Sequence, residues 1–197
     1  MAPAPARGTS LSFRPWPAGE RDLGASLERS RIDALTYAPA GVSMGDLAPS
    51  GLTRRHWTTP LAGSNAFERA VEALGTWKMH RGAGLRVAAD GPIAVGTNVA
   101  FSAPLPIGFV DGTCRIVVVV DEPNRFGFAY GTLSVHPERG EESFVVSRDD
   151  DGNVRLDIDG VSRPTHPLAR LVPPLADHLQ DRGVRRYLAA MRTLTRD

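Results

Sequence analysis

The densest group of polar side chains in the sequence lies between residues 130 and 163. It consists of Tyr130, His136, Glu138, Glu141, Glu142 and Arg163. A histidine beside paired carboxylates can carry out acid–base chemistry or bind a metal ion. A tight turn would bring His136 and Glu141 within reach of each other. A structural role is favoured over these, because Pro137–Gly140 is typical of an exposed hairpin and Glu142 can pair with Arg163 on a neighbouring strand.

The other reactive side chains favour structural roles. His80 precedes Arg81 at the expected end of a helix, where a cation stabilises the helix dipole. Cys114 is the only cysteine and begins an apolar run, which indicates an inert buried thiol. Gly82-Ala83-Gly84 lacks the Gly-Lys-Ser/Thr of a phosphate loop, and no Gly-x-Ser-x-Gly is present. We therefore predict no metal and no cofactor, and we assign no catalytic residue.

Composition narrows the class of protein. The chain has 197 residues, 42% of them hydrophobic, which is enough for one domain with a buried core. Its 23 basic and 22 acidic residues give a net charge of +1, so no nucleic-acid partner is predicted. No apolar run approaches the roughly 18 residues of a membrane span. The first residues do not resemble a signal peptide, which predicts a cytoplasmic location and leaves the oligomeric state open.

The hydrophobic periodicity predicts the elements that hold these side chains. Residues 1–20 are rich in Pro, Ala and Gly and are expected to form a flexible tail, and residues 21–197 a single domain. Helices are expected at 22–35 and 64–84, a first strand at 52–59, and an antiparallel series of strands at 85–89, 93–103, 109–121, 125–135, 141–148 and 154–161. A long C-terminal helix follows, with an apolar stripe from Leu168 to Met191 and a kink at Pro173-Pro174.

This order predicts an α+β helix-grip fold, in which a curved antiparallel β-sheet is wrapped around the long C-terminal helix. Such a sheet tends to leave a cavity beneath the helix, where small molecules bind. Within 125–135, aromatic residues occupy one face and Gly127, Ala129 and Gly131 the other. The missing side chains either let the helix approach closely or leave a void.

Several motifs resemble those of the UPF0548 family, also called the domain of unknown function 1990. The core motif matches at 126–133 and 136–144, and further matches occur at 35–37, 77–80, 84–85, 162–164 and 185–188. Two departures are Val135, where the family has Gly, and Gly160-Val161, where it has Ala-Phe. The resemblance implies the order of elements and no activity. A more distant resemblance to the START and Bet v 1-like (SRPBCC) superfamily rests on element order.

The predicted fold and its polar side chains lead to three hypotheses for the function. The first is a binding module for a hydrophobic small molecule, with candidate ligand-binding residues Trp77, Phe126, Phe128, Tyr130, His136, Glu138, Glu142 and Arg163. In that set the aromatic side chains form the walls, and His136 or Arg163 anchors a polar group. The second is an enzyme that uses His136 with Glu138 or Glu142 as acid and base in the same cavity. The third is a structural or interaction protein with a filled core.

Overall fold

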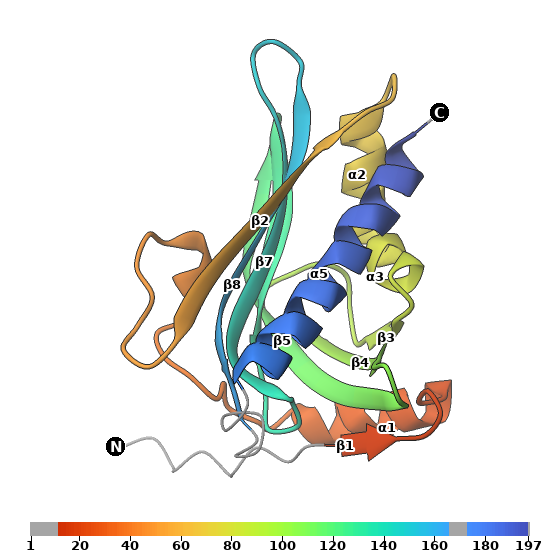
Figure 1. Ribbon diagram of the computed structural model, residues 1–197, viewed down its shortest axis with the longest axis vertical. Helices are drawn as coiled ribbons and strands as arrows, with labels where there is room; N and C mark the ends of the chain where they lie inside the picture. The colour runs from red at the N-terminus through yellow and green to blue at the C-terminus, as the bar shows by residue number, and fades with distance from the viewer. Residues whose placement is uncertain (1–11, 166–172, 197) are drawn as a thin grey trace.

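The computed structural model describes residues 12–165 and 173–196, with the backbone alone for 173–177 (Figure 1). The elements are β1 (Ser12–Arg14), α1 (Glu20–Ser30), the 3-10 turn η1 (Val42–Met44), β2 (Thr53–Leu61), α2 (Ala66–Gly75), α3 (Lys78–Gly82), β3 (Arg86–Ala89), β4 (Asn98–Pro104), β5 (Phe109–Glu122), β6 (Arg125–Thr132), β7 (Glu138–Arg148), β8 (Val154–Pro164) and α5 (Pro173–Thr195). No helix in the described ranges is both long and apolar enough to cross a membrane.

One antiparallel sheet dominates the molecule. Its strand order is β2-β8-β7-β6-β5-β4-β3, and β1 adds to β5. The sheet curves, and α5, α2 and α3 lie on its concave side (Figure 1). The predicted α+β helix-grip fold is therefore confirmed. Residues 166–172, which include the start of the predicted apolar stripe, lie outside the described residues.

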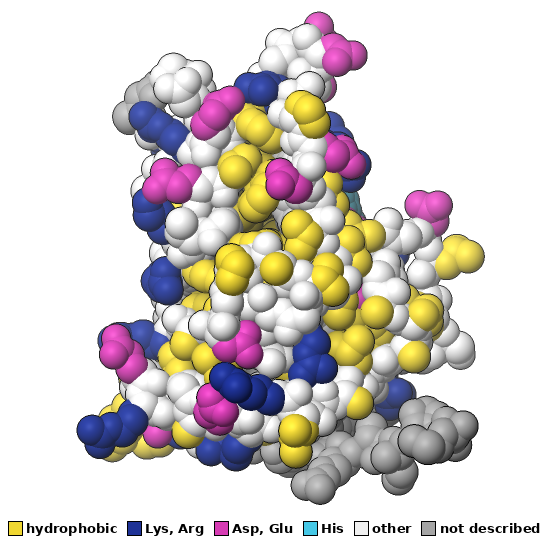
Figure 2. All heavy atoms as spheres, turned by 180° about the vertical axis from the view of Figure 1, so that it is seen from behind, with side chains coloured by type: hydrophobic (Ala, Val, Ile, Leu, Met, Phe, Trp, Pro, Cys, Tyr) yellow, Lys and Arg dark blue, Asp and Glu magenta, His cyan; other side chains and the backbone are white. Residues whose placement is uncertain are grey.

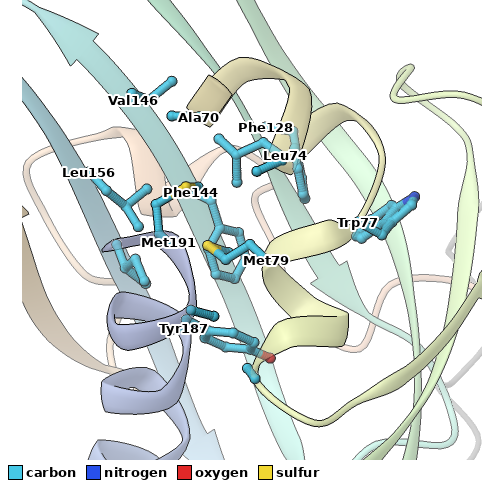
Figure 3. Packing of buried hydrophobic residues seen from close by; sticks show 14 of the residues in the cluster. Ala70, Leu74, Trp77, Met79, Phe128, Phe144, Val146, Leu156, Tyr187 and Met191 are labelled. Atoms are coloured by element: carbon cyan, nitrogen blue, oxygen red, sulfur yellow. The ribbon is translucent and has the colours of Figure 1, made fainter. Parts of the chain in front are cut away.

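The core fills the upper part of the concave side. Alternate residues of the central strands point inward because side chains alternate across a strand. Phe144 and Leu156 from the sheet meet Leu74, Met79 and Met191 from the helices, and all five are fully buried (Figure 3). This packing anchors the C-terminal half of α5, so the space that remains lies beneath its N-terminal half.

Trp77 divides the helix expected over residues 64–84 into α2 and α3. Its backbone is left-handed, with φ of 61°, which is uncommon for a bulky residue. The indole is buried, with its ring centroid 5.2 Å from that of Phe128 and 5.0 Å from that of His80. Tertiary packing thus holds a backbone conformation that helical periodicity could not reveal.

The N-terminal part of the chain covers the outer, convex face of the sheet. β1 pairs with β5, and Ala18 is buried, so residues 12–20 are folded where a flexible tail was expected. A Cβ on Gly131 would overlap the Tyr37 ring and the Leu35 side chain. Gly131 therefore admits this N-terminal segment, whereas a Cβ on Gly127 would overlap the β7 backbone at Phe144 and Val145. Neither a close helix nor a void accounts for these two glycines.

Charged side chains of both signs are mixed over the surface. Figure 2 shows Lys and Arg interspersed with Asp and Glu around patches of hydrophobic atoms on the face opposite to that of Figure 1. This face carries no broad field of one sign, in keeping with the net charge of +1.

Candidate functional site

A cavity of about 350 Å³ lies between the concave face of the sheet and α5. Its apolar lining includes Phe101, Ala103, Pro104, Leu105, Val110, Leu179 and Val184, and its polar lining includes Tyr130, Thr132, His136, Glu138, Glu142, Ser162, Gln180 and Tyr187. The helical contribution follows the spacing i, i+3, i+4, i+7 from Gln180 to Tyr187, which places these residues on one face of α5. The polar side chains come mainly from β6, β7 and β8.

A glycine on α5 leaves room in this cavity. Gly183 lines it, and a Cβ built there would meet no atom within 4 Å. Glycine inside a helix costs about 1 kcal/mol relative to alanine. No neighbouring group would clash with a larger side chain at residue 183. The effect of the glycine here is to leave space in the cavity.

Glu142 projects from β7 into the cavity. Its carboxyl oxygen Oε2 accepts a hydrogen bond of 3.1 Å from the Tyr130 hydroxyl, which in turn is a hydrogen-bond partner of Tyr187. Burial and the charge of Glu138 raise the pKa of Glu142 to about 8, and the bond from Tyr130 opposes that rise. Glu142 is thus mostly protonated at neutral pH.

Glu138 joins three elements at the same end of the cavity. Its Oε2 accepts hydrogen bonds from Ser162 Oγ on β8 at 2.7 Å and from Gln180 Nε2 on α5 at 3.3 Å. Gln180 also accepts a hydrogen bond from Arg55 on β2. These contacts fix the carboxylate at the junction of β7, β8 and α5.

His136 is held by the backbone of the following strand. Its Nδ1 accepts a hydrogen bond of 2.9 Å from the Glu138 amide, and its ring packs edge-on against Phe101 with centroids 5.4 Å apart. Burial lowers the pKa of His136 to about 4, although the Glu138 carbonyl oxygen, 3.0 Å from Nδ1, opposes this because it can accept a hydrogen bond from the protonated ring. The ring is therefore neutral at pH 7, and Nε2 is the nitrogen that remains for a ligand.

Glu141 belongs to the opposite face of the sheet. Its carboxylate accepts hydrogen bonds from Gly41 N at 2.8 Å, Ser43 N at 2.8 Å, Ser43 Oγ at 2.5 Å and the Tyr37 hydroxyl. Burial and this carboxylate raise the pKa of Tyr37. Glu141 therefore fastens the N-terminal segment to the convex face and does not pair with His136 as the sequence suggested.

Comparison with known proteins places the chain in a family. The family described as "Domain of unknown function (DUF1990)" matches residues 36–190. The chain belongs to the DUF1990 family. A UPF0548 protein of Deinococcus radiodurans is 34% identical over 177 residues, covering 84% of this chain and 89% of the relative. A UPF0548 protein of Dictyostelium discoideum is 32% identical over 136 residues, covering 62% of each chain.

Solved structures show the same fold at low sequence identity. The hypothetical protein jhp0584 from Helicobacter pylori superimposes with a TM-score of 0.56 at 14% identity, covering 73% of this chain and 88% of that one. Ara h 8.0201 does so with a TM-score of 0.50 at 13% identity, covering 74% and 96%. The predicted membership of the UPF0548 family is thus confirmed by the family match. The distant Bet v 1-like resemblance is confirmed at the level of fold alone. The function of the family is unknown.

The DUF1990 domain gathers half of the predicted ligand-binding residues. Tyr130, His136, Glu138 and Glu142 line the cavity. Trp77 and Phe128 are buried in the core, Phe126 packs against that core, and Arg163 is not among the residues lining the cavity.

Two expectations for this region were wrong. Residues 138–140 belong to β7, not to an exposed hairpin, and His136 is only 8% exposed. Glu142 lies opposite Gly160, whereas Arg163 lies opposite Arg139, so the predicted Glu142–Arg163 pair is not formed. The family departure at Val135 causes no strain, because Trp77 is the only non-glycine residue with positive φ in the described ranges.

The sequence predicted a cavity beneath the C-terminal helix but not the residues of α5 and β8 that line it. Gln180, Gly183 and Tyr187 share one helical face, and Ser162 aligns with Gly140 across β7 and β8. The helical spacing was visible in the sequence. What the sequence lacked was the position of this face over the carboxylates, which depends on how α5 crosses the sheet.

His80 also differs from the role that its sequence position predicted. It is 1% exposed, and neither ring nitrogen has a hydrogen-bond partner. The rings of Trp77, Phe144 and Tyr187 lie about 5 Å away. Burial lowers the pKa of His80 to about 3, so it is neutral and does not act as the cationic helix cap that we expected.

Proposed function

We propose that this protein binds a small, largely apolar molecule with one polar group in the cavity beneath α5. The volume of about 350 Å³ is within the usual range of small-molecule sites, roughly 300–1,000 Å³. Phe101, Leu105 and Val184 offer an apolar wall, while Glu138 and Glu142 offer polar contacts at one end. An apolar body with a single polar end matches this distribution.

The observation that carries the proposal is the open space at Gly183. Protein interiors are usually packed as densely as organic crystals, so a space of this size beneath a core helix is unusual. The helix gives up the stability that a larger residue would supply at this position. Retaining that space benefits a ligand and contributes nothing to the fold.

The test fills the cavity without disturbing the core. In Gly183→Phe the new ring would occupy the space of the ligand, because no atom lies within 4 Å of the Cβ position. Gly24→Phe on α1 is the matched control, since Gly24 is also helical with nothing within 4 Å of a Cβ. Binding of the neutral dye 1-aminoanthracene would be measured by fluorescence, and co-purifying molecules by native mass spectrometry.

We expect the unmodified chain and Gly24→Phe to bind the dye equally. Gly183→Phe should lose at least tenfold in affinity while its thermal unfolding remains cooperative. If all three chains bind equally, or none binds the dye or carries a molecule, the proposal is wrong.

A second candidate function is an enzyme acting in the same cavity. The observation that favours it is the pKa of Glu142, raised to about 8, because an acid or base works best when its pKa is near the working pH. His136 and Glu138 line the same space and would complete the acid–base set. Glu142→Gln separates the two functions, since it would abolish turnover of a bound molecule and leave binding of a neutral ligand intact.

A further inference from the structure

We propose that His136 binds the ligand of this cavity through its Nε2–H group, and that the polar group of the ligand is a neutral carbonyl, as in a ketone or an ester. The inference rests on the function proposed above and adds the chemical class of the ligand. It goes beyond that function because an apolar cavity alone would accept a hydrocarbon, an alcohol, an acid or a carbonyl compound.

The neutral ring of His136 carries its hydrogen on Nε2. The amide of Glu138 points its N–H group at Nδ1, with 2.9 Å between the two nitrogens. A backbone amide always carries its hydrogen, so a second hydrogen on Nδ1 would lie against it. The carbonyl oxygen of Glu138, 3.0 Å from Nδ1, therefore receives no hydrogen from the neutral ring. This backbone contact makes Nε2 a hydrogen-bond donor.

Nε2 of His136 is available to a ligand. His136 lines the cavity, and within the described residues its Nε2 has no hydrogen-bond partner. The atom is not sealed in by its neighbours, in contrast to both ring nitrogens of His80. A donor that faces an apolar cavity without a partner is unfavourable until an acceptor reaches it.

The polar side chains nearby are already engaged within the protein. Ser162 and Tyr130 each donate a hydrogen bond to a glutamate of β7. Gln180 uses its amide nitrogen for one of these glutamates and for the Ser162 hydroxyl. These bonds do not include His136, so a ligand acceptor meets an unused donor at Nε2.

The protein fixes the position of the imidazole before a ligand arrives. The carbonyl oxygen of Val135 accepts hydrogen bonds from the amide and the hydroxyl of Thr113, at 2.6 and 3.1 Å. A Cβ on Gly112 would overlap the rings of both Phe101 and His136. Glycine at this position therefore leaves the space that the imidazole occupies. A donor held in place in this way binds with little loss of conformational entropy.

The surroundings of Nε2 favour a carbonyl over other acceptors. The imidazole packs edge-on against Phe101, with ring centroids 5.4 Å apart, so this part of the site is apolar. A carbonyl oxygen accepts from Nε2 and brings no hydrogen that needs a partner of its own. A hydroxyl group would bring one, and leaving it unpaired beside Phe101 is unfavourable. A carboxylate would bring a negative charge, which a neutral imidazole does not balance.

The test uses probes that share a phenyl ring and a two-carbon side chain. Acetophenone carries a ketone, 1-phenylethanol a hydroxyl group, phenylacetate a carboxylate, and ethylbenzene no polar group. Each would displace 1-aminoanthracene from the full chain at pH 7, and the loss of dye fluorescence would give its affinity. We expect acetophenone to bind about tenfold more tightly than ethylbenzene and about threefold more tightly than 1-phenylethanol, with phenylacetate the weakest.

Two variants at residue 136 separate the donor from the fold. In His136→Asn the side-chain oxygen can still accept from the amide two residues on, but the shorter side chain does not reach the position of Nε2. In His136→Gln the side-chain amide nitrogen reaches that position and remains a donor. His136→Asn should bind acetophenone and ethylbenzene about equally, whereas His136→Gln should keep most of the preference for the ketone. His56→Asn, at a half-exposed position on β2, is the control and should change neither affinity.

A spectroscopic measurement reports on the hydrogen bond itself. The carbonyl stretching band of acetophenone labelled with carbon-13 would be recorded by infrared difference spectroscopy. A hydrogen bond from Nε2 weakens the C=O bond, so the band should lie at lower wavenumber in the unmodified chain than in His136→Asn. A change in the stability of the fold would leave the band in place.

The outcomes separate the two proposals. The carbonyl is overturned, and the ligand-binding function stands, if acetophenone and ethylbenzene displace the dye equally or if 1-phenylethanol or phenylacetate binds more tightly than acetophenone. The same holds if His136→Asn keeps both the preference for the ketone and the position of the infrared band. If Gly183→Phe binds the dye as tightly as the unmodified chain, or if neither binds it, both proposals are overturned.

Discussion

Glu141 and Glu142 are neighbours on β7, yet they face opposite sides of the sheet and opposite electrostatic conditions. Glu141 is 2% exposed, and its carboxylate accepts four hydrogen bonds from the segment 37–43. Glu142 has one such partner, Tyr130, and faces a cavity. Burial alone therefore does not decide the role of a carboxylate. Glu141, which accepts four hydrogen bonds, anchors a segment of the chain, whereas Glu142, which accepts one, can still respond to a ligand.

The largest expected effect concerns the anchor. Glu141→Ala should lower the free energy of unfolding by about 3–5 kcal/mol, because it leaves the buried donors on residues 41 and 43 without a charged acceptor. Urea denaturation at pH 7 would measure the change. Glu28→Ala, an exposed glutamate on α1, should change it by less than about 0.5 kcal/mol. A loss under about 1 kcal/mol for Glu141→Ala would remove the contrast between the two carboxylates.

The second prediction concerns the pH dependence of the stability that Glu142 contributes. Its pKa is about 8 in the folded chain and 4.5 ordinarily, so between these values the folded state holds a proton that the unfolded state has lost. The stability that Glu142 contributes is therefore present below about pH 4.5 and is lost as the pH rises toward 8.

Glu142→Gln removes this titration and keeps the shape of the protonated side chain. Relative to the unmodified chain, the variant should gain about 1 kcal/mol per pH unit between pH 5 and 7.5, as measured by urea denaturation at each pH. A constant difference in the free energy of unfolding across that range would show that Glu142 does not hold a proton in the folded chain.

The smallest expected change in stability concerns Gly183, which lines the cavity from α5. Gly183→Ala should raise the free energy of unfolding by about 0.5–1 kcal/mol, because alanine favours the helix and its Cβ meets no neighbour. Gly24→Ala should give a similar gain. In Gly82→Ala the Cβ would lie 3.1 Å from that of Ala190, so the gain should be absent. Only Gly183→Ala is expected to weaken dye binding as well.

Much of the fold was predictable because it depends on local alternation. β6 and β8 begin at Arg125 and Val154, the residues at which their period-two patterns begin, and β5 begins at Phe109, where the predicted strand with the apolar run begins. The break at Trp77 was not predictable, because a left-handed aromatic residue is held there by packing against Phe128. The start of β7 was missed because Pro, Glu, Arg and Gly at 137–140 are typical of a turn.

The candidate site was predictable in part. Tyr130, Glu138 and Glu142 were identified from their chemistry, and the alternation of a strand could have separated Glu141 from Glu142. The contribution of Gln180 and Gly183 required the crossing of α5 over the sheet. Residues distant in sequence meet there through tertiary packing, which no local pattern reports.

The most direct measurement is a carbon-13 NMR titration of the glutamate side-chain carboxyl groups, with Glu142 assigned by comparison with Glu142→Gln. Without ligand, one carboxyl should titrate near pH 8 and be absent from the variant. A Glu142 that titrates below about pH 5 would contradict this account.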